Sequence, residues 1–177
     1  MREFRAWPSI SRLSRDMIIT EKLDGTNAQV CVEEDGTVLA GSRTRWITPE
    51  NDNAGFARWV KEHEDELRVG LGPGEHFGEW WGPGIQRRYS IPEKRFSLFN
   101  VHRWTDDVRP ACCHVVPILY TGLFDTGKVD AVLLELATTG SVASPGFMTP
   151  EGIIVFHVPS RMSFKKTLDK NDGHKGS

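Results

Sequence analysis

The stretch "EKLDGTNAQV", residues 21–30, decides how this chain is interpreted. Lys22 stands two residues ahead of an Asp-Gly pair, between the apolar-rich runs "MIIT" (17–20) and "NAQVCVEE" (27–34). An Asp-Gly pair between such runs is typical of a tight β-hairpin turn. The stretch therefore has two interpretations: a solvated lysine beside a hairpin turn, or a lysine that the turn presents for chemistry.

The segments around this stretch predict strands and two main helices. A second Asp-Gly pair at 35–36 separates further apolar-rich runs, which favours an antiparallel meander. Helical periodicity predicts a helix over 51–72, with Asn and Asp available as N-cap, and another over 127–141, with Gly140 near its end. Strands are predicted over 17–20, 27–34, 37–43, 74–82, 94–104, 114–122, 151–158 and 161–168. The fold class is α+β, mostly antiparallel sheet.

Composition narrows the class of protein. A length of 177 residues suits one domain with a sizeable core. Lys and Arg number 22 and Asp and Glu 24, a net charge of −2, so any phosphate-binding surface must be a local patch. No run approaches the ~18 consecutive apolar residues of a membrane span, and the charged N-terminus lacks a signal-peptide pattern. Cys31, Cys112 and Cys113 form neither a disulfide framework nor a zinc motif, which predicts reduced thiols in a cytoplasmic protein.

Residues able to carry chemistry recur along the chain in five further short motifs. They are Arg43 in "SRTR" (42–45), Glu79 in "FGEW" (77–80), Phe99 in "FSLFNV" (96–101), Glu151 in "EGIIV" (151–155), and Lys165 and Lys166 in "FKKTL" (164–168). Each has an ordinary interpretation alone: a surface arginine, a satisfied carboxylate, a core aromatic ring, the start of a strand, and two solvent-facing lysines.

Together with "EKLDGTN" (21–27), these motifs stand in the order of the covalent nucleotidyltransferase superfamily, the polynucleotide ligases and mRNA capping enzymes, which the chain resembles from about residue 20 to 170. Asn27, where DNA ligases usually carry arginine, is similar to the RNA ligase branch, and "GEWWGPGIQRRYSIPEKRFSLFNVHRW" (78–104) looks like small phage-type RNA ligases. The resemblance implies an α+β nucleotidyltransferase (ATP-grasp-like ligase) domain of two packed, mainly antiparallel sheets with flanking helices and ATP in the groove between them. It also implies a single adenylyltransferase domain over 1–177, without the separate C-terminal domain of many ligases.

The resemblance also assigns roles. The implied catalytic residues are Lys22, as nucleophile, with Lys165 and Glu151. The residues implied to bind ATP are Glu21, Lys22, Asn27, Arg43, Glu79, Phe99, Lys165 and Lys166. The carboxylates implied to hold Mg²⁺ or Mn²⁺ are Asp24, Glu79 and Glu151. Among these, Phe99 would stack on the base, Asn27 would hold a ribose or end-phosphate group, and Glu21 would contact the base edge.

The chemistry of nucleotidyl transfer agrees with these residue roles. A lysine attacks phosphorus only as the neutral amine, and its ordinary pKa is about 10.4, so nearby positive charge from Lys165 and a divalent cation must favour the neutral form. The triphosphate and the departing pyrophosphate need cations such as Arg43 and Lys166. Because strand alternation sends Lys165 and Lys166 to opposite faces, we expect Lys165 to point inward. The role of Lys166 stays open, and Lys170 is an alternative.

RNA is the implied partner, as a nicked duplex or a broken tRNA, with DNA less favoured and no membrane. The loop 84–95 carries four basic residues around Tyr89, which suits a phosphate backbone with a stacked base, although an ordinary charged loop explains it equally. The basic residues are Arg87, Arg88, Lys94 and Arg95. Without a C-terminal domain, two alternatives stay open: a minimal ligase, or a ligase that needs a partner protein in place of that domain. The expected location is the cytoplasm, or the host cytoplasm if a phage encodes the chain.

Three other functions share part of this pattern. A DNA nick ligase uses the same first step and does not require ribose at the 3′-hydroxyl end. A capping-type guanylyltransferase accepts GTP and loads GMP on Lys22. A nucleotide- or RNA-binding module with a relict site binds ATP without a covalent adduct.

Overall fold

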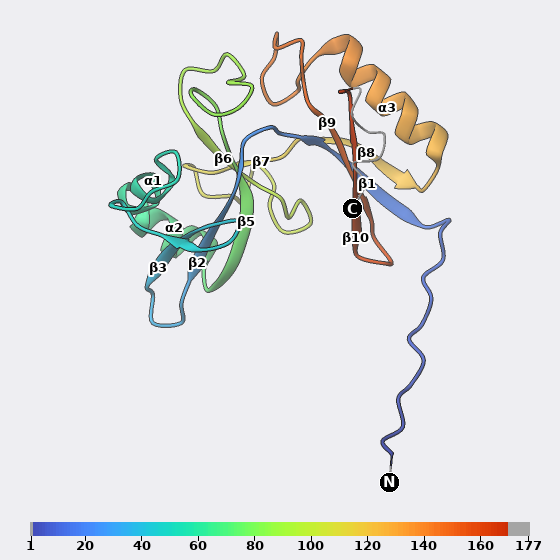
Figure 1. The fold of residues 1–177 in the computed structure, drawn as a ribbon, viewed down its shortest axis with the longest axis horizontal. Helices are drawn as coiled ribbons and strands as arrows, with labels where there is room; N and C mark the ends of the chain where they lie inside the picture. Colours follow the sequence, from blue (N-terminus) through green and yellow to red (C-terminus); the bar gives the residue numbers. More distant parts are fainter. Residues whose placement is uncertain (1, 170–177) are drawn as a thin grey trace.

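The computed structural model describes residues 2–169 and contains two β-sheets (Figure 1). The four-stranded sheet has the order β10-β9-β1-β8, with β1 at Asp16–Lys22, β8 at Ile118–Leu123, β9 at Gly152–His157 and β10 at Met162–Thr167. The six-stranded sheet has the order β4-β3-β2-β5-β6-β7, with β2 at Thr26–Val32, β3 at Val38–Ser42, β4 at Trp46–Ile47, β5 at Gly74–Trp81, β6 at Arg95–Leu98 and β7 at His114–Val115. Neighbouring strands are antiparallel except β6 and β7, which confirms the predicted fold class.

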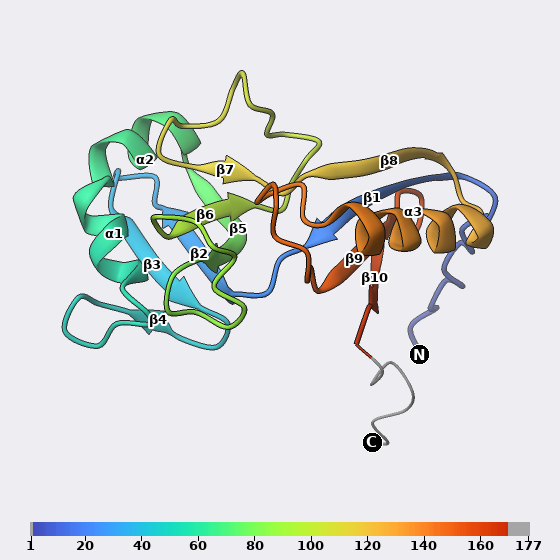
Figure 2. The same cartoon turned by 90° about the horizontal axis from the view of Figure 1, so that it is seen from above.

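Helices cover one face of each sheet (Figure 2). α1 (Phe56–Glu62) and α2 (Glu64–Leu71) pack on the six-stranded sheet, and α3 (Thr126–Thr139) packs on the four-stranded sheet. The prediction of one helix over 51–72 is wrong, because the helix starts only after Gly55, which has a φ of 84°, and is interrupted at His63. Asp52 nevertheless caps the first turn, since its carboxylate accepts the N–H groups of Ala57 and Arg58.

Within residues 2–169, buried apolar side chains form three clusters. One lies beneath α1 and α2, and another lies beneath α3. The third lies where the two sheets meet and consists of Leu23, Trp81, Tyr89 and Val116. Because Leu23 directly follows Lys22, the junction of the sheets is packed beside the candidate nucleophile.

The segment between β1 and β2 crosses from one sheet to the other. β1 pairs with β8 and β9, whereas β2 pairs with β3 and β5, so the predicted hairpin around Asp24-Gly25 is wrong. Only glycine fits at position 25 without a clash, because a Cβ built there would lie 2.3 Å from the Trp80 carbonyl oxygen and 2.7 Å from Trp81 Cβ. The second Asp-Gly pair does form the predicted hairpin, between β2 and β3, where Gly36 has a φ of 87°.

Two other predicted strands differ in extent. The run 114–122 is divided between β7 in the six-stranded sheet and β8 in the four-stranded sheet, because the chain changes sheets around Pro117. The strand predicted over 94–104 ends at Leu98, and the chain then turns so that Trp104 joins the cluster beneath α1 and α2.

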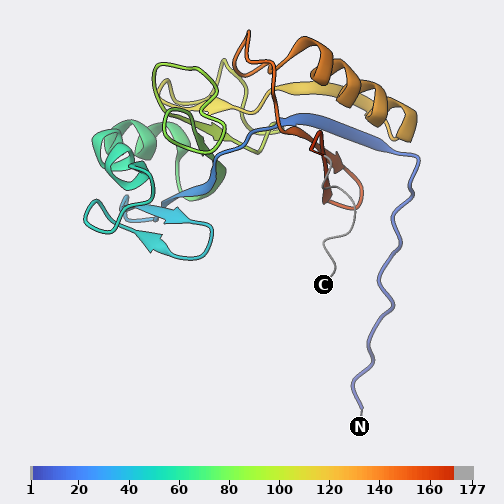
Figure 3. The same cartoon turned by 45° about the horizontal axis from the view of Figure 1, so that its top comes forward.

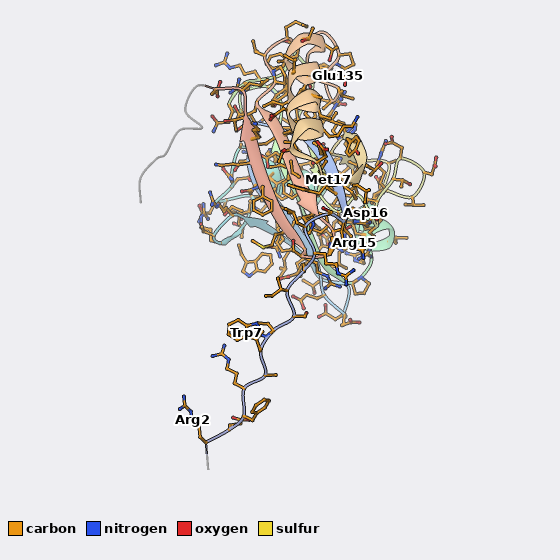
Figure 4. All side chains as sticks on the ribbon, turned by 90° about the vertical axis from the view of Figure 1, so that its right-hand side faces the viewer. Arg2, Trp7, Arg15, Asp16, Met17 and Glu135 are labelled. Carbon is orange, nitrogen blue, oxygen red and sulfur yellow. The ribbon has the colours of Figure 1, made fainter. Side chains whose placement is uncertain are left out.

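The N-terminal residues lie apart from both sheets (Figure 3). Arg2 and Trp7 stand away from the body, whereas Arg15 and Asp16 lie where β1 begins (Figure 4). Ser11 Oγ donates to the carbonyl of Pro159 at 3.2 Å, which ties the segment to the turn between β9 and β10.

Two findings concern the cysteines and the apolar character of the helices. Cys31, Cys112 and Cys113 are free thiols, the first and last buried. In the part of the chain that the structure describes, no helix combines the length and the apolar character that crossing a membrane requires.

Replacing Gly25 by alanine is expected to destabilise the fold, because the new methyl group would meet the backbone of Trp80. The expected loss in free energy of unfolding is on the order of 1–3 kcal/mol, measured by urea denaturation. Gly84→Ala is the control: Gly84 has a φ of 78° with nothing within 4 Å of the added Cβ, so only backbone strain of about 1 kcal/mol applies. A loss at Gly25 no larger than the loss at Gly84 would contradict the crowding argument.

Candidate active site

Lys22 is the last residue of β1, and strand register places it beside Glu151. β1 and β9 are antiparallel with Lys22 opposite Gly152, the first residue of β9, so Glu151 lies at the same edge. Lys22 Nζ is 2.6 Å from Glu151 Oε2, and the two side chains are 22% and 15% exposed. This charge-assisted hydrogen bond fixes the position of the Lys22 amine beside the Glu151 carboxylate.

Glu79 belongs to the other sheet and reaches the same place. β2 and β5 pair with Asn27 opposite Glu79. Glu79 Oε1 accepts the N–H of Gly25 at 2.9 Å, and Oε2 accepts a hydrogen from Asn27 Nδ2 at 3.2 Å. These contacts tie the chain just beyond Lys22 to β5.

Burial raises the pKa of Glu79 from 4.5 to about 7. The N–H of Gly25 and the positive charge of Lys22 oppose this rise, and the negative charges of Glu151 and Asp24 add to it. Lys22, Asp24, Glu79 and Glu151 therefore form one electrostatic group, which we call the lysine cluster.

Phe99 and Arg43 lie further along the six-stranded sheet. The N–H of Phe99 donates to the carbonyl of Phe77 at 3.0 Å, just past β6, and the Phe99 ring is 41% exposed. Alternation places Phe99 on the same face as Ser97, which lies opposite Glu79 in register. Arg43 is exposed in the turn between β3 and β4, at the end of β3 that lies next to Asn27. An aromatic ring and a cation thus flank the face of the sheet that carries Glu79.

The two lysines of β10 lie on opposite faces. Lys165 is opposite Ile154, which is opposite Thr20, so Lys165 is exposed on the face that Thr20 shares with Lys22. Lys166 lies on the other face, where it forms an ion pair with Asp130 of α3. The structure therefore brings Lys165 to the side of Lys22 and does not bring Lys166 there. Lys170 lies outside the described residues.

Glu21 is also turned away from the lysine cluster, because it precedes Lys22 in β1. Its carboxylate is buried and accepts hydrogen bonds from Ser141 Oγ at 2.6 Å and from the N–H groups of Val142 and Ala143 at 2.8 and 3.0 Å. Glu21 therefore holds the segment that follows α3. The contact of Glu21 with a nucleobase stays a prediction.

Asp24 is held by an arginine that the motifs did not assign to this site. Arg87 Nε donates to Asp24 Oδ2 at 2.8 Å. The one available sequence signal is that Arg87 follows the "FGEW" motif closely, in "GPGIQR". The expectation that Tyr89 stacks on an RNA base is wrong, because Tyr89 is fully buried and its hydroxyl accepts the N–H of Asp24 at 2.8 Å.

The carboxylates of the lysine cluster have the chemistry that a divalent cation requires. Among residues 2–169, no three His, Cys, Asp or Glu side chains are arranged to bind a metal ion by themselves. Mg²⁺ commonly binds one or two carboxylates together with water and substrate phosphates. The repulsion of Glu151 and Asp24 on Glu79 favours added positive charge. The carboxylates of the lysine cluster therefore suit a cation that arrives with a triphosphate.

Solved structures of the Naegleria gruberi RNA ligase share this fold. A mutant with ATP and Mn matches with a TM-score of 0.62 at 18% identity, over 87% of this chain and 49% of that chain. A mutant with AMP and Mn matches with a TM-score of 0.61 at 19% identity, over 88% of this chain and 50% of that one. The ligase with PPi matches with a TM-score of 0.59 at 18% identity, over 87% and 50%. This chain spans about half the length of the structures it matches.

A family model described as RNA ligase matches residues 15–170. The matched range begins just before β1, extends past the end of β10, and includes every residue of the lysine cluster. The chain therefore belongs to the RNA ligase family.

Proposed function

We propose that this chain joins RNA ends in an ATP-dependent reaction that passes through a lysyl-AMP intermediate on Lys22. The lysine cluster carries the proposal: Lys22 lies 2.6 Å from Glu151 on one sheet, and Gly25 ties the next turn to Glu79 on the other. Membership of the RNA ligase family supports it, as does the fold shared with an RNA ligase solved with ATP and Mn and with AMP and Mn.

In the first step, the neutral amine of Lys22 attacks the α-phosphorus of ATP. A P–N bond forms, the bond from the α-phosphorus to the bridging oxygen breaks, pyrophosphate leaves, and the nitrogen gives up a proton. Glu151 Oε2 already accepts a hydrogen bond from Lys22 Nζ, so it is placed to take that proton. A divalent cation held by the cluster's carboxylates would neutralise phosphate charge.

The other residues of the site bind and orient ATP in this proposal. The exposed ring of Phe99 stacks on the adenine, and Asn27 holds a ribose hydroxyl or a phosphate oxygen. Arg43 and Lys165 are exposed cations that neutralise the triphosphate and the pyrophosphate as it leaves. Positioning and charge neutralisation supply most of the rate in such transfers.

In the second step, a 5′-phosphate of RNA attacks the lysyl-AMP phosphorus, and Lys22 leaves as the amine. In the third, a 3′-hydroxyl attacks the activated phosphate and AMP leaves. Both steps need RNA held in line with the lysine cluster, and we propose that a partner protein contributes part of that surface. The phage origin and the cytoplasmic location stay predictions.

Replacing Lys22 by alanine or arginine is expected to abolish adenylylation, since neither side chain supplies a nucleophilic amine. The measurement incubates the protein with ATP labelled at the α-phosphate and Mg²⁺ or Mn²⁺, and then separates it on a denaturing gel. Lys165→Ala is expected to slow labelling about 100-fold, through lost charge stabilisation.

Lys128→Ala is the matched control, because Lys128 is exposed on α3, and its labelling should equal that of the wild type. Label that persists on the Lys22 variants would contradict the proposal. GTP in a parallel lane tests the capping alternative. Nicked duplexes with ribose or deoxyribose at the 3′-hydroxyl end separate RNA joining from DNA joining.

The raised pKa of Glu79 predicts that the stability of the metal-free protein depends on pH. Because its folded-state pKa is about 7, against an ordinary 4.5, the folded protein binds more protons than the unfolded chain between these values. Stability therefore falls as pH rises through this window. Glu79→Gln removes this loss, so the stability of the variant relative to the wild type should rise by on the order of 1–3 kcal/mol between pH 4.5 and 7.5.

Urea denaturation in EDTA at several pH values measures this difference. Glu135→Gln is the control, because Glu135 is exposed on α3 (Figure 4), and its difference from the wild type should stay constant. An equally flat profile for Glu79→Gln would show that Glu79 does not hold its proton in the folded state.

A further inference from the structure

Arg87 contacts three separate segments around the lysine cluster. Its Nε donates to Asp24 Oδ2 at 2.8 Å, its Nη1 to the carbonyl of Thr149 at 3.2 Å, and its Nη2 to Asp169 Oδ2 at 2.5 Å. Asp24 lies two residues after Lys22, Thr149 lies two residues before Glu151, and Asp169 follows β10. One guanidinium therefore connects the segments that carry the candidate nucleophile, its carboxylate partner and the lysines of β10.

We propose that Arg87 is a positioning residue for lysine adenylylation, which fixes the turn after Lys22 against the segment that carries Glu151. This inference rests on the proposed function. No contact joins Arg87 to Lys22 or Glu151 themselves, so it acts through Asp24 and through the backbone of Thr149. Its effect falls on the geometry of Lys22 at the moment of attack, where small displacements reduce the rate strongly.

The shape of the guanidinium suits this role. Arginine presents five N–H groups in a rigid planar fork, whereas lysine offers one point charge on a flexible stem. Three acceptors in different directions need that fork. Burial opposes the charged form of Arg87, but Asp169 and Asp24 outweigh it and raise its pKa above the ordinary value. The side chain is 23% exposed, so the contacts are partly shielded from water.

The loop that presents Arg87 has an unusual backbone. Gln86, Arg88, Tyr89 and Ser90 all have positive φ, at 40°, 65°, 49° and 53°. Left-handed conformations cost roughly 1–2 kcal/mol for residues other than glycine, so surrounding contacts must hold the loop. The buried Tyr89 ring and the bond from Ser144 Oγ to the Tyr89 carbonyl do so. Arg87 is thus directed at Asp24 by a loop that tertiary packing fixes.

The test compares Arg87→Ala, Arg87→Lys and Asp169→Ala with the wild type. Single-turnover labelling at saturating ATP gives the adenylylation rate, and binding of α,β-methylene-ATP, which cannot transfer AMP, gives nucleotide affinity. We expect Arg87→Ala to lower the rate 10- to 100-fold and to change affinity less than threefold. Arg87→Lys should recover part of the rate. Asp169→Ala should lose only about two- to threefold, because two of the three contacts remain.

Arg109→Ala is the matched structural control. Arg109 is 19% exposed, pairs with Asp106, and donates to the carbonyls of Pro110, Ala111 and Cys113, none of which belongs to the lysine cluster. Its loss should lower the melting temperature about as much as the loss of Arg87 does, without lowering the adenylylation rate. An adenylylation rate for Arg109→Ala as low as that for Arg87→Ala would mean that the loss of Arg87 acts only by lowering the general stability of the fold.

Three outcomes overturn the inference. The first is an Arg87→Ala rate equal to that of the wild type. The second is a loss that appears wholly as weaker analogue binding. If Arg87→Ala does not fold, the third is wild-type rates for both Arg87→Lys and Asp169→Ala. Absence of any adduct on the wild type is a separate result, because it contradicts the proposed function itself.

Discussion

Gly25 passes so close to β5 that no side chain fits between them, since an added Cβ would lie 2.3 Å from the carbonyl oxygen of Trp80. The same glycine donates its N–H to Glu79. The chain crosses from one sheet to the other at this contact, with Leu23 buried beside it. Lys22 belongs to the four-stranded sheet and Glu79 to the six-stranded sheet, so this crossing directly links the segments that carry them.

Charge in the lysine cluster is balanced without a ligand. Glu151 is paired with Lys22, and Asp24 is paired with Arg87. Burial and the two neighbouring carboxylates hold the pKa of Glu79 near 7, so it is part-protonated at neutral pH. A triphosphate adds several negative charges to this balance. In the proposed reaction, cations must therefore accompany ATP, and the exposed side chain of Lys165 is one that the chain itself can supply.

Strand periodicity, a local signal, predicted most of the strands, whereas the family resemblance in the order of the motifs predicted the two sheets and most of the residues gathered near Lys22. It predicted a hairpin at Asp24-Gly25, since turn chemistry cannot tell a tight turn from a close backbone approach. For Glu21, the carboxylate type gave no sign that the segment after α3 would supply its hydrogen bonds. Alternation predicted opposite faces for Lys165 and Lys166, but the pairing of Lys166 with Asp130 depends on where α3 packs.

Arg87 and Tyr89 are two more residues whose contacts could not be predicted from residue type. Their basic and aromatic character suggested an RNA surface, yet Tyr89 is buried at the junction of the sheets and Arg87 is turned towards Asp24. The direction of a side chain in an irregular loop is set by backbone conformations, here a run of positive φ values, that residue type does not specify. Residue patterns therefore did not predict these contacts between segments that are distant in sequence.

The adjacent residues Glu21 and Lys22 also fix the register of β1 in its sheet. The site that receives Glu21 directs three donors at it, two backbone N–H groups and a hydroxyl, which suits an anion and disfavours an ammonium. A shift of β1 by one residue would exchange the faces of its side chains, placing Lys22 against those donors in one direction, or Glu21 beside Glu151 in the other. Both placements are electrostatically unfavourable, so the order acid-then-base selects a single alignment of the strand. Glu21 thus helps to fix the position of Lys22, and the reversed order Lys-Glu would satisfy neither site in the present alignment.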